Sequence, residues 1–205
     1  IYATNELQNN PSYYIWAIQK LKPLEGSSLL DIACGLGDLI LFAKQRNLQC
    51  FGIDLSSIAV QKAKARIPGA FISVGNAEHL SFADESFDYV TMLGSLEHLA
   101  NPGNGLLEIR RVLKWGGKAL ILVPNSYYLP DIIWQVVLHG YGPDHKQPAE
   151  RFAPINEWRA FIESGGLAVK KVFVYNHQWP MHKGDWLWYK KNPRRILKLL
   201  FTPLI

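Results

Sequence analysis

The sequence predicts an α/β fold: a three-layer sandwich around a mostly parallel, seven-stranded sheet with helices on both faces. Two observations predict this class. Short apolar runs alternate with segments of helical periodicity from about residue 28 to residue 123, and turns rich in glycine and proline separate them. Parallel strands require such helical crossovers, which are right-handed and cover both faces of the sheet. The 205 residues are 48% hydrophobic and 19% charged, so we expect one domain over 1–205 with a large core.

The elements follow from local patterns. Pro11 opens an amphipathic segment, the polar run after residue 53 provides a helix N-cap, and Pro68 and Gly69 end that helix. We expect helices over 11–21, 38–46, 57–66, 103–113 and 156–164, and strands over 28–33, 50–53, 70–74, 87–93, 118–123, 167–175 and 186–190. Around this core we expect an N-terminal helical cover over 1–27, an insertion over 124–155, and a basic, apolar C-terminal helix within 192–205.

The most informative stretch is the end of the first strand and the turn after it, residues 29–39. An apolar run reaches Asp31, and the tight turn Gly35-Leu36-Gly37 then opens a helix. Nineteen residues past Gly35, a second apolar run ends in Asp54. A glycine turn brings bare backbone against a ligand, and an acid at the second position accepts ribose hydroxyls. The spacing therefore indicates a nucleoside-containing cofactor.

The same loop bears on which nucleoside cofactor it binds. A dinucleotide fingerprint has a third glycine, which lets the helix approach the strand, but Ile40 stands at that position. Asp38 places an acid at the start of the helix, where it would repel a pyrophosphate. These residues favour a cofactor with an adenosine and no phosphate, such as S-adenosylmethionine. They disfavour the alternative of a nicotinamide-dependent oxidoreductase.

Four segments in order resemble the class I S-adenosylmethionine-dependent methyltransferases with the methyltransferase-11 type of core. They are Leu-Asp-Ile-Ala-Cys-Gly-Leu-Gly at 30–37, Gly-Ile-Asp-Leu-Ser at 52–56, the loop and strand over 75–90, and the helix with its approach over 96–117. The resemblance is close over 29–123 and loose over 150–190. It implies a Rossmann-like fold, S-adenosylmethionine as methyl donor and S-adenosylhomocysteine as product.

The resemblance also implies roles for single residues. Asp31 would hold the methionine amino group, and Asp54 would take the ribose hydroxyls. The remaining cofactor residues would be the backbone of Ala33, Gly35 and Gly37 around methionine and ribose, Leu55 against the adenine, Asn76 and Ala77 at the adenine edge, and Leu93 with Gly94 facing the sulfonium. Two residues depart from the family pattern: Ala33 replaces a common glycine, and Asn76 replaces a common aspartate.

The candidate catalytic residues are His98 and His145. Transfer from a sulfonium is an in-line displacement that positioning alone accelerates, so a base is needed only when the acceptor loses a proton. His98 follows the fourth strand, and His145 lies in the insertion. The alternatives are that His98 and Glu97 brace a local turn and that His145 is a solvated loop residue. We expect no metal site, because no ligand spacing is present.

The acceptor side is expected after the fifth strand. Residues 1–125 have no net charge, whereas residues 126–205 hold 11 Lys and Arg against 6 Asp and Glu, together with five of the seven tryptophans. The basic, apolar stretch 190–201 fits contact with an anionic membrane surface, attraction of an anionic, lipid-linked or sugar-linked small molecule, or simple docking on the domain. Nucleic acid is disfavoured, because no RNA-binding module is present. A non-catalytic adenosyl-binding scaffold remains the alternative function.

Cysteine usage and hydropathy suggest a cytoplasmic protein, at most peripheral to a membrane. Cys34 and Cys50 both lie in apolar runs and are expected to be reduced, buried thiols. No stretch reads as a signal peptide or reaches the roughly 20 apolar residues that span a bilayer.

Overall fold

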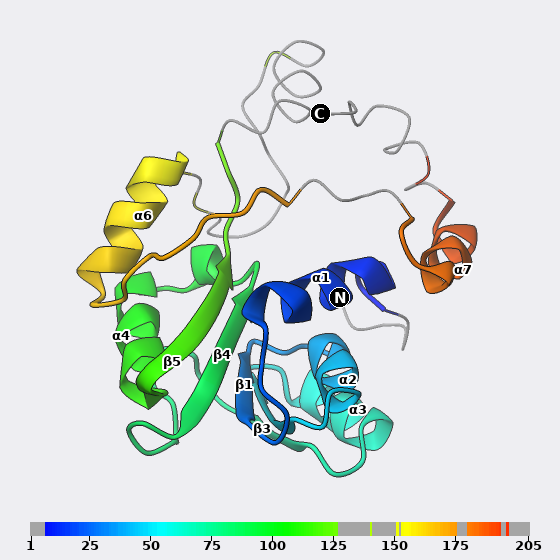
Figure 1. Cartoon of the computed structure of the whole chain (residues 1–205), viewed down its shortest axis with the longest axis horizontal. Coiled ribbons are helices and arrows are strands. Elements are labelled where there is room, and N and C mark those ends of the chain that lie inside the picture. The colour runs from blue at the N-terminus through cyan, green and yellow to red at the C-terminus, as the bar shows by residue number, and fades with distance from the viewer. Residues whose placement is uncertain are drawn as a thin grey trace.

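The structure, a computed structural model, describes residues 7–126, 140, 151, 153–175, 180–193 and 196. In these residues five parallel strands form one sheet in the order β3-β2-β1-β4-β5 (Figure 1). The strands are β1 (Ser28–Ile32), β2 (Gln49–Asp54), β3 (Phe71–Val74), β4 (Phe87–Leu93) and β5 (Leu113–Leu122). The helices are α1 (Pro11–Leu21), α2 (Asp38–Lys44), α3 (Ser57–Arg66), η1 (Leu96–His98), α4 (Pro102–Val112), α6 (Ile155–Ser164) and α7 (Lys183–Lys191). The predicted α/β class and its parallel sheet are confirmed.

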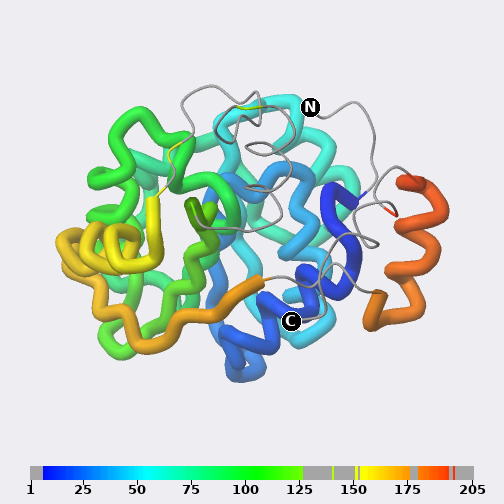
Figure 2. Tube along the Cα trace, turned by 90° about the horizontal axis from the view of Figure 1, so that it is seen from above, coloured from blue at the N-terminus to red at the C-terminus, as the bar shows by residue number. Residues whose placement is uncertain are grey.

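Helices cover both faces of the sheet, as Figures 1 and 2 show. Neighbouring residues of the central strand β1 point to opposite faces: Leu29 packs in the core under α1, α2 and α3, and Leu30 packs in the core under α4. Both side chains are fully buried. A strand buried on both faces is the normal state of a central parallel strand, and it explains why residues 28–32 form a nearly continuous apolar run.

The contact between α2 and the sheet explains how the chain tolerates Ile40. A Cβ atom added to Gly52 of β2 would lie 2.6 Å from Ile40 Cδ1 and 2.9 Å from Cys34 Sγ. Gly52 therefore makes room for the Ile40 side chain, which is fully buried. In the dinucleotide fingerprint the small residue lies on the helix, whereas here it lies on the neighbouring strand.

The predicted strand over 167–175 is wrong, because this segment forms no strand among the described residues. It follows α6 as an extended connection, and residues 171–174 are all exposed, so no alternating face is buried. Its end is held by rings instead of a backbone ladder: Tyr175 packs edge-on against Tyr13 at 5.0 Å and lies 4.8 Å from the Trp16 ring. The segment thus binds α1 through side chains.

The predicted strand over 186–190 is also wrong, because these residues belong to helix α7. His182 and Asp185 form a capping box at its N-terminus, which satisfies N–H groups that a helix start leaves open. Asp185 is fully buried and also accepts hydrogen bonds from the backbone N–H and hydroxyl of Ser12 in α1. α7 lies beside α1 in both views. The basic, apolar helix expected over 194–201 lies outside the described residues, except for Ile196.

The two ends of the segment 124–155 meet at the edge of the described domain. Asn125 and Ala153 form an isolated parallel bridge, and Trp158 Nε1 donates to the Pro124 carbonyl at 2.8 Å. The interior of this expected insertion falls outside the described residues, apart from Gly140 and Arg151. Among the helices that the structure describes, none combines the length and apolarity needed to cross a bilayer.

Candidate functional site

Asp31 lies in β1 near its carboxyl end, almost completely buried at 4% exposure. The Thr91 hydroxyl of β4 donates to Asp31 Oδ1 at 2.7 Å. Burial raises the pKa of Asp31 to about 7, the hydrogen bond from Thr91 opposes this rise, and the charges of Asp38 and Asp54 add to it. A buried carboxyl among other acids is a poor anion by itself, and a cationic group would strongly favour its ionised form.

The loop after β1 has three residues in the left-handed region. Ala33 has a φ of 56°, Gly35 of 54° and Gly37 of 74°. A Cβ is disfavoured in this conformation by about 1–2 kcal/mol, so Ala33 stands at a position that suits glycine. The loop therefore turns sharply over the sheet edge and brings its backbone to the position that a ligand would approach.

Asp54 ends β2 and holds this loop. Its Oδ2 accepts from the Gly35 N–H and its Oδ1 from the Ser56 N–H, both at 2.8 Å. The N-cap of α3 is Ser56, whose hydroxyl accepts from Ala59 N–H, so Asp54 does not serve only as a helix cap. An ionised carboxylate has about four acceptor positions, and these two bonds leave capacity for two further hydroxyl donors.

Asp38 does not present the free negative charge that the sequence argument assumed. It forms an ion pair with Arg66 of α3 and accepts from the Tyr14 hydroxyl at 2.9 Å and the Gln8 N–H at 3.0 Å. Its charge is offset, so the exclusion of a pyrophosphate rests on Ile40. Asp38 instead fastens the segment preceding and including α1 to the glycine-rich turn.

The other predicted cofactor residues lie along the same carboxyl edge of the sheet. Leu55 follows β2 and is 77% exposed, whereas Ala77 is buried and Asn76 is exposed. The Asn76 side chain accepts from Glu78 N–H at 3.0 Å, which fixes the turn after β3. Leu93 ends β4, and Gly94 follows it with a φ of 67°. Because Asp54 pairs with Val74, and Leu93 with Leu122, these strand ends are level with each other.

The two candidate histidines have different outcomes. His98 lies in η1, with 27% of its side chain exposed and Nε2 3.9 Å from Glu97 Oε1. His145 lies outside the described residues. Sequence reasoning missed Glu97 and Tyr13 as site residues, although both are buried near the sheet edge. The only available signal was an acid between the apolar residues Leu96 and Leu99. No group of three or more potential metal ligands occurs in the part of the chain that the structure describes.

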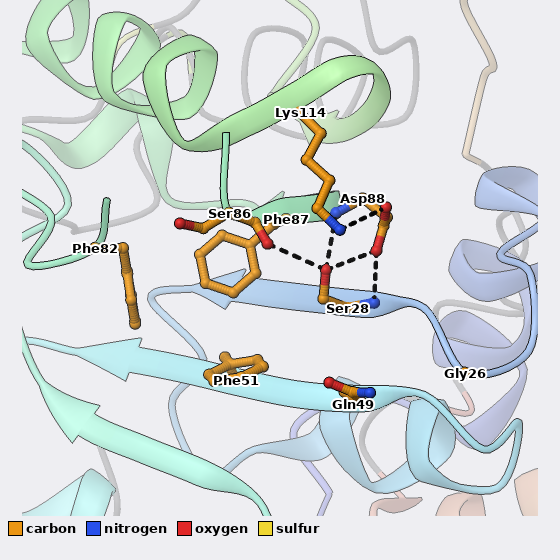
Figure 3. Close-up of a pocket in the computed structure, with 9 residues that line it drawn as sticks. All are labelled: Gly26, Ser28, Gln49, Phe51, Phe82, Ser86, Phe87, Asp88 and Lys114. Atoms are coloured by element: carbon orange, nitrogen blue, oxygen red, sulfur yellow. Dashed lines mark hydrogen bonds and ion pairs between the residues drawn. The ribbon is translucent and has the colours of Figure 1, made fainter. Parts of the chain in front are cut away.

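A pocket of about 400 Å³ opens at the opposite, amino-terminal edge of the sheet (Figure 3). Lys114 reaches from β5 toward Ser28 and Asp88, while phenylalanine rings form another part of the wall. It is lined by Gly26, Ser28, Gln49, Phe51, Phe82, Ser86, Phe87, Asp88 and Lys114. None of the predicted cofactor residues lines it, and open α/β sheets bind their ligands beyond the carboxyl ends of the strands. This pocket is therefore separate from the candidate cofactor site.

Comparison with known proteins agrees with the fold. Residues 30–121 match the protein family described as "Methyltransferase domain". Residues 30–121 therefore form a methyltransferase domain of the class I S-adenosylmethionine-dependent type, which confirms the predicted family over this part of the chain. This family implies S-adenosylmethionine as the cosubstrate, as predicted.

Its relatives include enzymes named for quinone biosynthesis. The chain is 32% identical over 120 residues to the ubiquinone/menaquinone biosynthesis C-methyltransferase of Geotalea daltonii, covering 54% of this chain and 51% of that relative. It is 34% identical over 159 residues to the demethylmenaquinone methyltransferase of Symbiobacterium thermophilum, covering 73% and 59%. The chain thus spans about half the length of the first of these curated relatives.

One relative matches over most of the chain. The uncharacterized methyltransferase YcgJ of Bacillus subtilis is 26% identical over 186 residues, which cover 86% of this chain and 70% of that protein. Its crystal structure superposes with a TM-score of 0.65 at 22% identity, covering 93% of this chain and 82% of that one. This structural likeness establishes the fold.

Proposed function

We propose that this chain moves a methyl group from S-adenosylmethionine to a small-molecule acceptor. The observation that carries the proposal is the arrangement at the carboxyl edge. A buried acid, Asp31, stands beside a left-handed glycine turn, and Asp54 faces that turn with acceptor capacity to spare. S-adenosylmethionine has the complementary parts: an ammonium, a ribose with two hydroxyls and a cationic sulfonium.

Each predicted residue has a place in this proposal. Asp31 holds the methionine ammonium, and the backbone of Ala33, Gly35 and Gly37 follows methionine and ribose. Asp54 accepts the ribose hydroxyls, Leu55 covers the adenine, Asn76 and Ala77 border its edge, and Leu93 faces the sulfonium. The chemistry needs the acceptor atom in line with the methyl carbon, and such positioning supplies about 7–11 kcal/mol in favourable intramolecular cases.

Calorimetry with S-adenosylmethionine and NAD tests the cofactor assignment. We expect S-adenosylmethionine to bind and NAD to give no heat, because the turn lacks the third glycine of the dinucleotide fingerprint, with Ile40 in its place. Asp54→Ala should weaken S-adenosylmethionine binding by removing the ribose acceptor. Tight NAD binding would contradict the proposal and favour an oxidoreductase.

The acceptor is proposed to be a small molecule carrying an anionic, lipid or sugar group. The support is the positive balance of residues 126–205 and the quinone-related names of the relatives. Mass spectrometry of reactions with quinol precursors, sugar phosphates and lipid-linked precursors tests it. Cofactor binding without methylated product from any panel member would favour the scaffold alternative.

Peripheral membrane contact through 190–201 is a further part of the proposal. Lys190 and Lys191 lie at the end of α7, exposed, and continue into the basic stretch of the sequence. Each basic residue near an anionic surface contributes about 1 kcal/mol at most, so the binding should weaken with salt. Sedimentation with phosphatidylserine vesicles at low salt checks this, and no binding there would remove the membrane contact.

A further inference from the structure

Glu97 is a buried carboxylate at the point where the reaction is proposed to occur. It lies in η1, three residues beyond Gly94, and is only 4% exposed. The residues on either side of it differ in burial: Leu96 is fully buried in the core, and His98 is partly exposed. A Cβ built on Gly94 would lie 3.8 Å from Glu97 Oε1, so this oxygen faces the backbone that ends β4. Burying a carboxylate is costly, and such groups concentrate at functional sites.

Tyr13 connects Glu97 with the cofactor acid Asp31. The phenol lies on α1 at 7% exposure, with edge-on ring contacts to Tyr14 and Tyr175, each at 5.0 Å. Burial raises the pKa of Tyr13, and the charges of Asp31 and Glu97 raise it further. Both carboxylates thus act electrostatically on the same phenol. Glu97 and Asp31, the residue proposed to bind the methionine end, contribute negative potential to the same region beside α1.

Arg151 braces the backbone that carries Glu97. Its guanidinium donates to the Glu97 carbonyl at 3.1 Å, to the Leu99 carbonyl at 2.6 Å and to the Ala100 carbonyl at 3.3 Å. These bonds fix the turn after β4 from the far end of the segment 124–155. A proton acceptor has to be held within hydrogen-bond reach of its donor, and this brace restricts where Glu97 can move.

We propose that the Glu97 carboxylate accepts the proton that the methyl acceptor loses during transfer. This inference rests on the proposed methyltransferase function. The acceptor oxygen or nitrogen bonds to the methyl carbon, and the carbon–sulfur bond breaks with its electron pair going to sulfur. The proton leaves the acceptor atom for a Glu97 oxygen and passes to water after product release. A sulfonium cation and a carboxylate anion thus become a neutral sulfide and a neutral carboxylic acid.

The placement also restricts the acceptor. Asp31 and Glu97 give this part of the site a negative potential, which repels a nucleophile that is already an anion. The structure therefore favours an acceptor whose reacting atom belongs to a neutral hydroxyl or amine that still carries its hydrogen. Any anionic group of the acceptor has to lie away from this end, which is compatible with the basic C-terminal part of the chain.

Binding of two cofactor analogues tests whether Glu97 faces the transferred methyl. S-adenosylhomocysteine lacks the methyl, and sinefungin carries a cationic amine where the methyl stands. Calorimetry on Glu97→Gln should show sinefungin affinity reduced at least about 10-fold and S-adenosylhomocysteine affinity unchanged within about twofold. Glu163→Gln is the matched control, because it makes the same carboxylate-to-amide change at an exposed residue of α6, and it should leave both affinities unchanged. Unchanged S-adenosylhomocysteine binding also shows that the variant is folded.

The outcomes separate the two proposals. Equal sinefungin affinity in wild type and Glu97→Gln would overturn the role of Glu97 while the methyltransferase function stands. Absence of S-adenosylhomocysteine and S-adenosylmethionine binding to wild type would overturn both. With a hydroxyl or amine acceptor identified in the panel, Glu97→Gln should lower kcat about 10²–10⁴-fold at unchanged KM for S-adenosylmethionine. A variant that keeps wild-type kcat and its pH profile would overturn the proton transfer.

Discussion

Each edge of the sheet carries a hydroxyl hydrogen-bonded to a carboxylate, but the pKa of the carboxylate is raised at one edge and lowered at the other. At each edge a hydroxyl and a carboxylate join β1 to β4 across 2.7 Å: Thr91 with Asp31 at the carboxyl edge, and Ser28 with Asp88 at the amino edge. Burial raises the pKa of Asp31 to about 7. Partial burial by itself would raise the pKa of Asp88. The hydrogen bonds from Ser28 and Lys114, together with the Lys114 charge, outweigh burial and lower this pKa to about 2.

The difference lies in what surrounds each carboxylate. Lys114 Nζ lies 2.9 Å from Asp88 Oδ1, so the protein itself supplies the counter-charge there. Asp31 instead feels the acids Asp38 and Asp54. Asp88 at the amino edge has its counter-charge in the protein, whereas Asp31 at the carboxyl edge is proposed to meet a cation that arrives with a ligand. Four experiments test this difference and the strained turn beside Asp31.

The largest expected effect is on the pH dependence of stability. The pKa of Asp31 rises from 3.8 in the unfolded chain to about 7, so the folded protein holds this proton more tightly. Protonated Asp31 therefore adds to the free energy of unfolding. This stabilisation, about 4 kcal/mol at most, is fully present below about pH 4 and is lost as the pH rises to 7. Denaturant unfolding of wild type and Asp31→Asn across this range checks it. The variant should show a flatter profile and higher stability at pH 8, and parallel profiles would break the contrast.

The next effect is on cofactor affinity. Asp31→Asn removes the proposed partner of the methionine ammonium, and a charged hydrogen bond of this kind contributes about 1.5–3 kcal/mol, or roughly 10–100-fold in Kd. Asp88→Asn makes the same chemical change at the other edge and should leave the Kd for S-adenosylmethionine within about twofold. Isothermal calorimetry compares the two. Similar losses in both variants would show that the carboxyl edge has no special role.

A smaller effect is expected for Asp88 on acid stability. Because its pKa is lowered, the stability that Asp88 contributes is present above about pH 4 and is lost as pH falls toward 2. Asp88→Asn should cost about 1 kcal/mol at pH 7, since the pair with Lys114 is partly exposed to solvent, and it should cost less at pH 2.5. Unfolding at both pH values measures this. A cost that grows in acid would contradict the assigned ion pair.

The smallest effect concerns the left-handed turn. Ala33→Gly should stabilise the protein by about 0.5–1 kcal/mol, because relief of the disfavoured φ exceeds the added entropy of the unfolded chain. Gly37→Ala is the matched reverse change. It should destabilise, since it adds the same strain and its Cβ meets Ile67 Cδ1 at 2.6 Å. Thermal unfolding of both variants measures this: Ala33→Gly should raise the Tm and Gly37→Ala should lower it, and changes of the same sign would contradict the prediction.

The local sequence was sufficient to predict those elements whose structure depends on residues close by in the chain. The turn from Asp31 to Gly37 and the acid Asp54 were predictable, because strand, turn and helix follow one another within about twenty-five residues. The predicted roles of these residues in cofactor binding remain predictions. The five strands of the described sheet were also predictable, because short apolar runs alternate with helical segments, although β5 begins at Leu113 and not at the predicted residue 118.

The errors arise where distant contacts decide. Residues 186–190 begin with the apolar and aromatic run Trp-Leu-Trp-Tyr, which suits a strand, but Asp185 caps α7 and accepts from Ser12, 173 residues away. Residues 167–175 have strand composition, yet rings on α1 hold their end in place of a ladder. Glu97 was missed because its burial depends on the turn after β4, on α1 and on the brace from Arg151, none of which the local sequence reveals.

The contacts between α1 and α7 have a consequence for the order of assembly. Trp188 Nε1 donates to the Leu7 carbonyl, and Asp185 accepts from the Ser12 N–H in the first turn of α1. During synthesis all five strands of the described sheet emerge before α7. Helix α1 can therefore pack on the sheet and on Asp38 first, whereas its hydrogen bonds with α7 form last, and a chain that stopped before α7 would lack them.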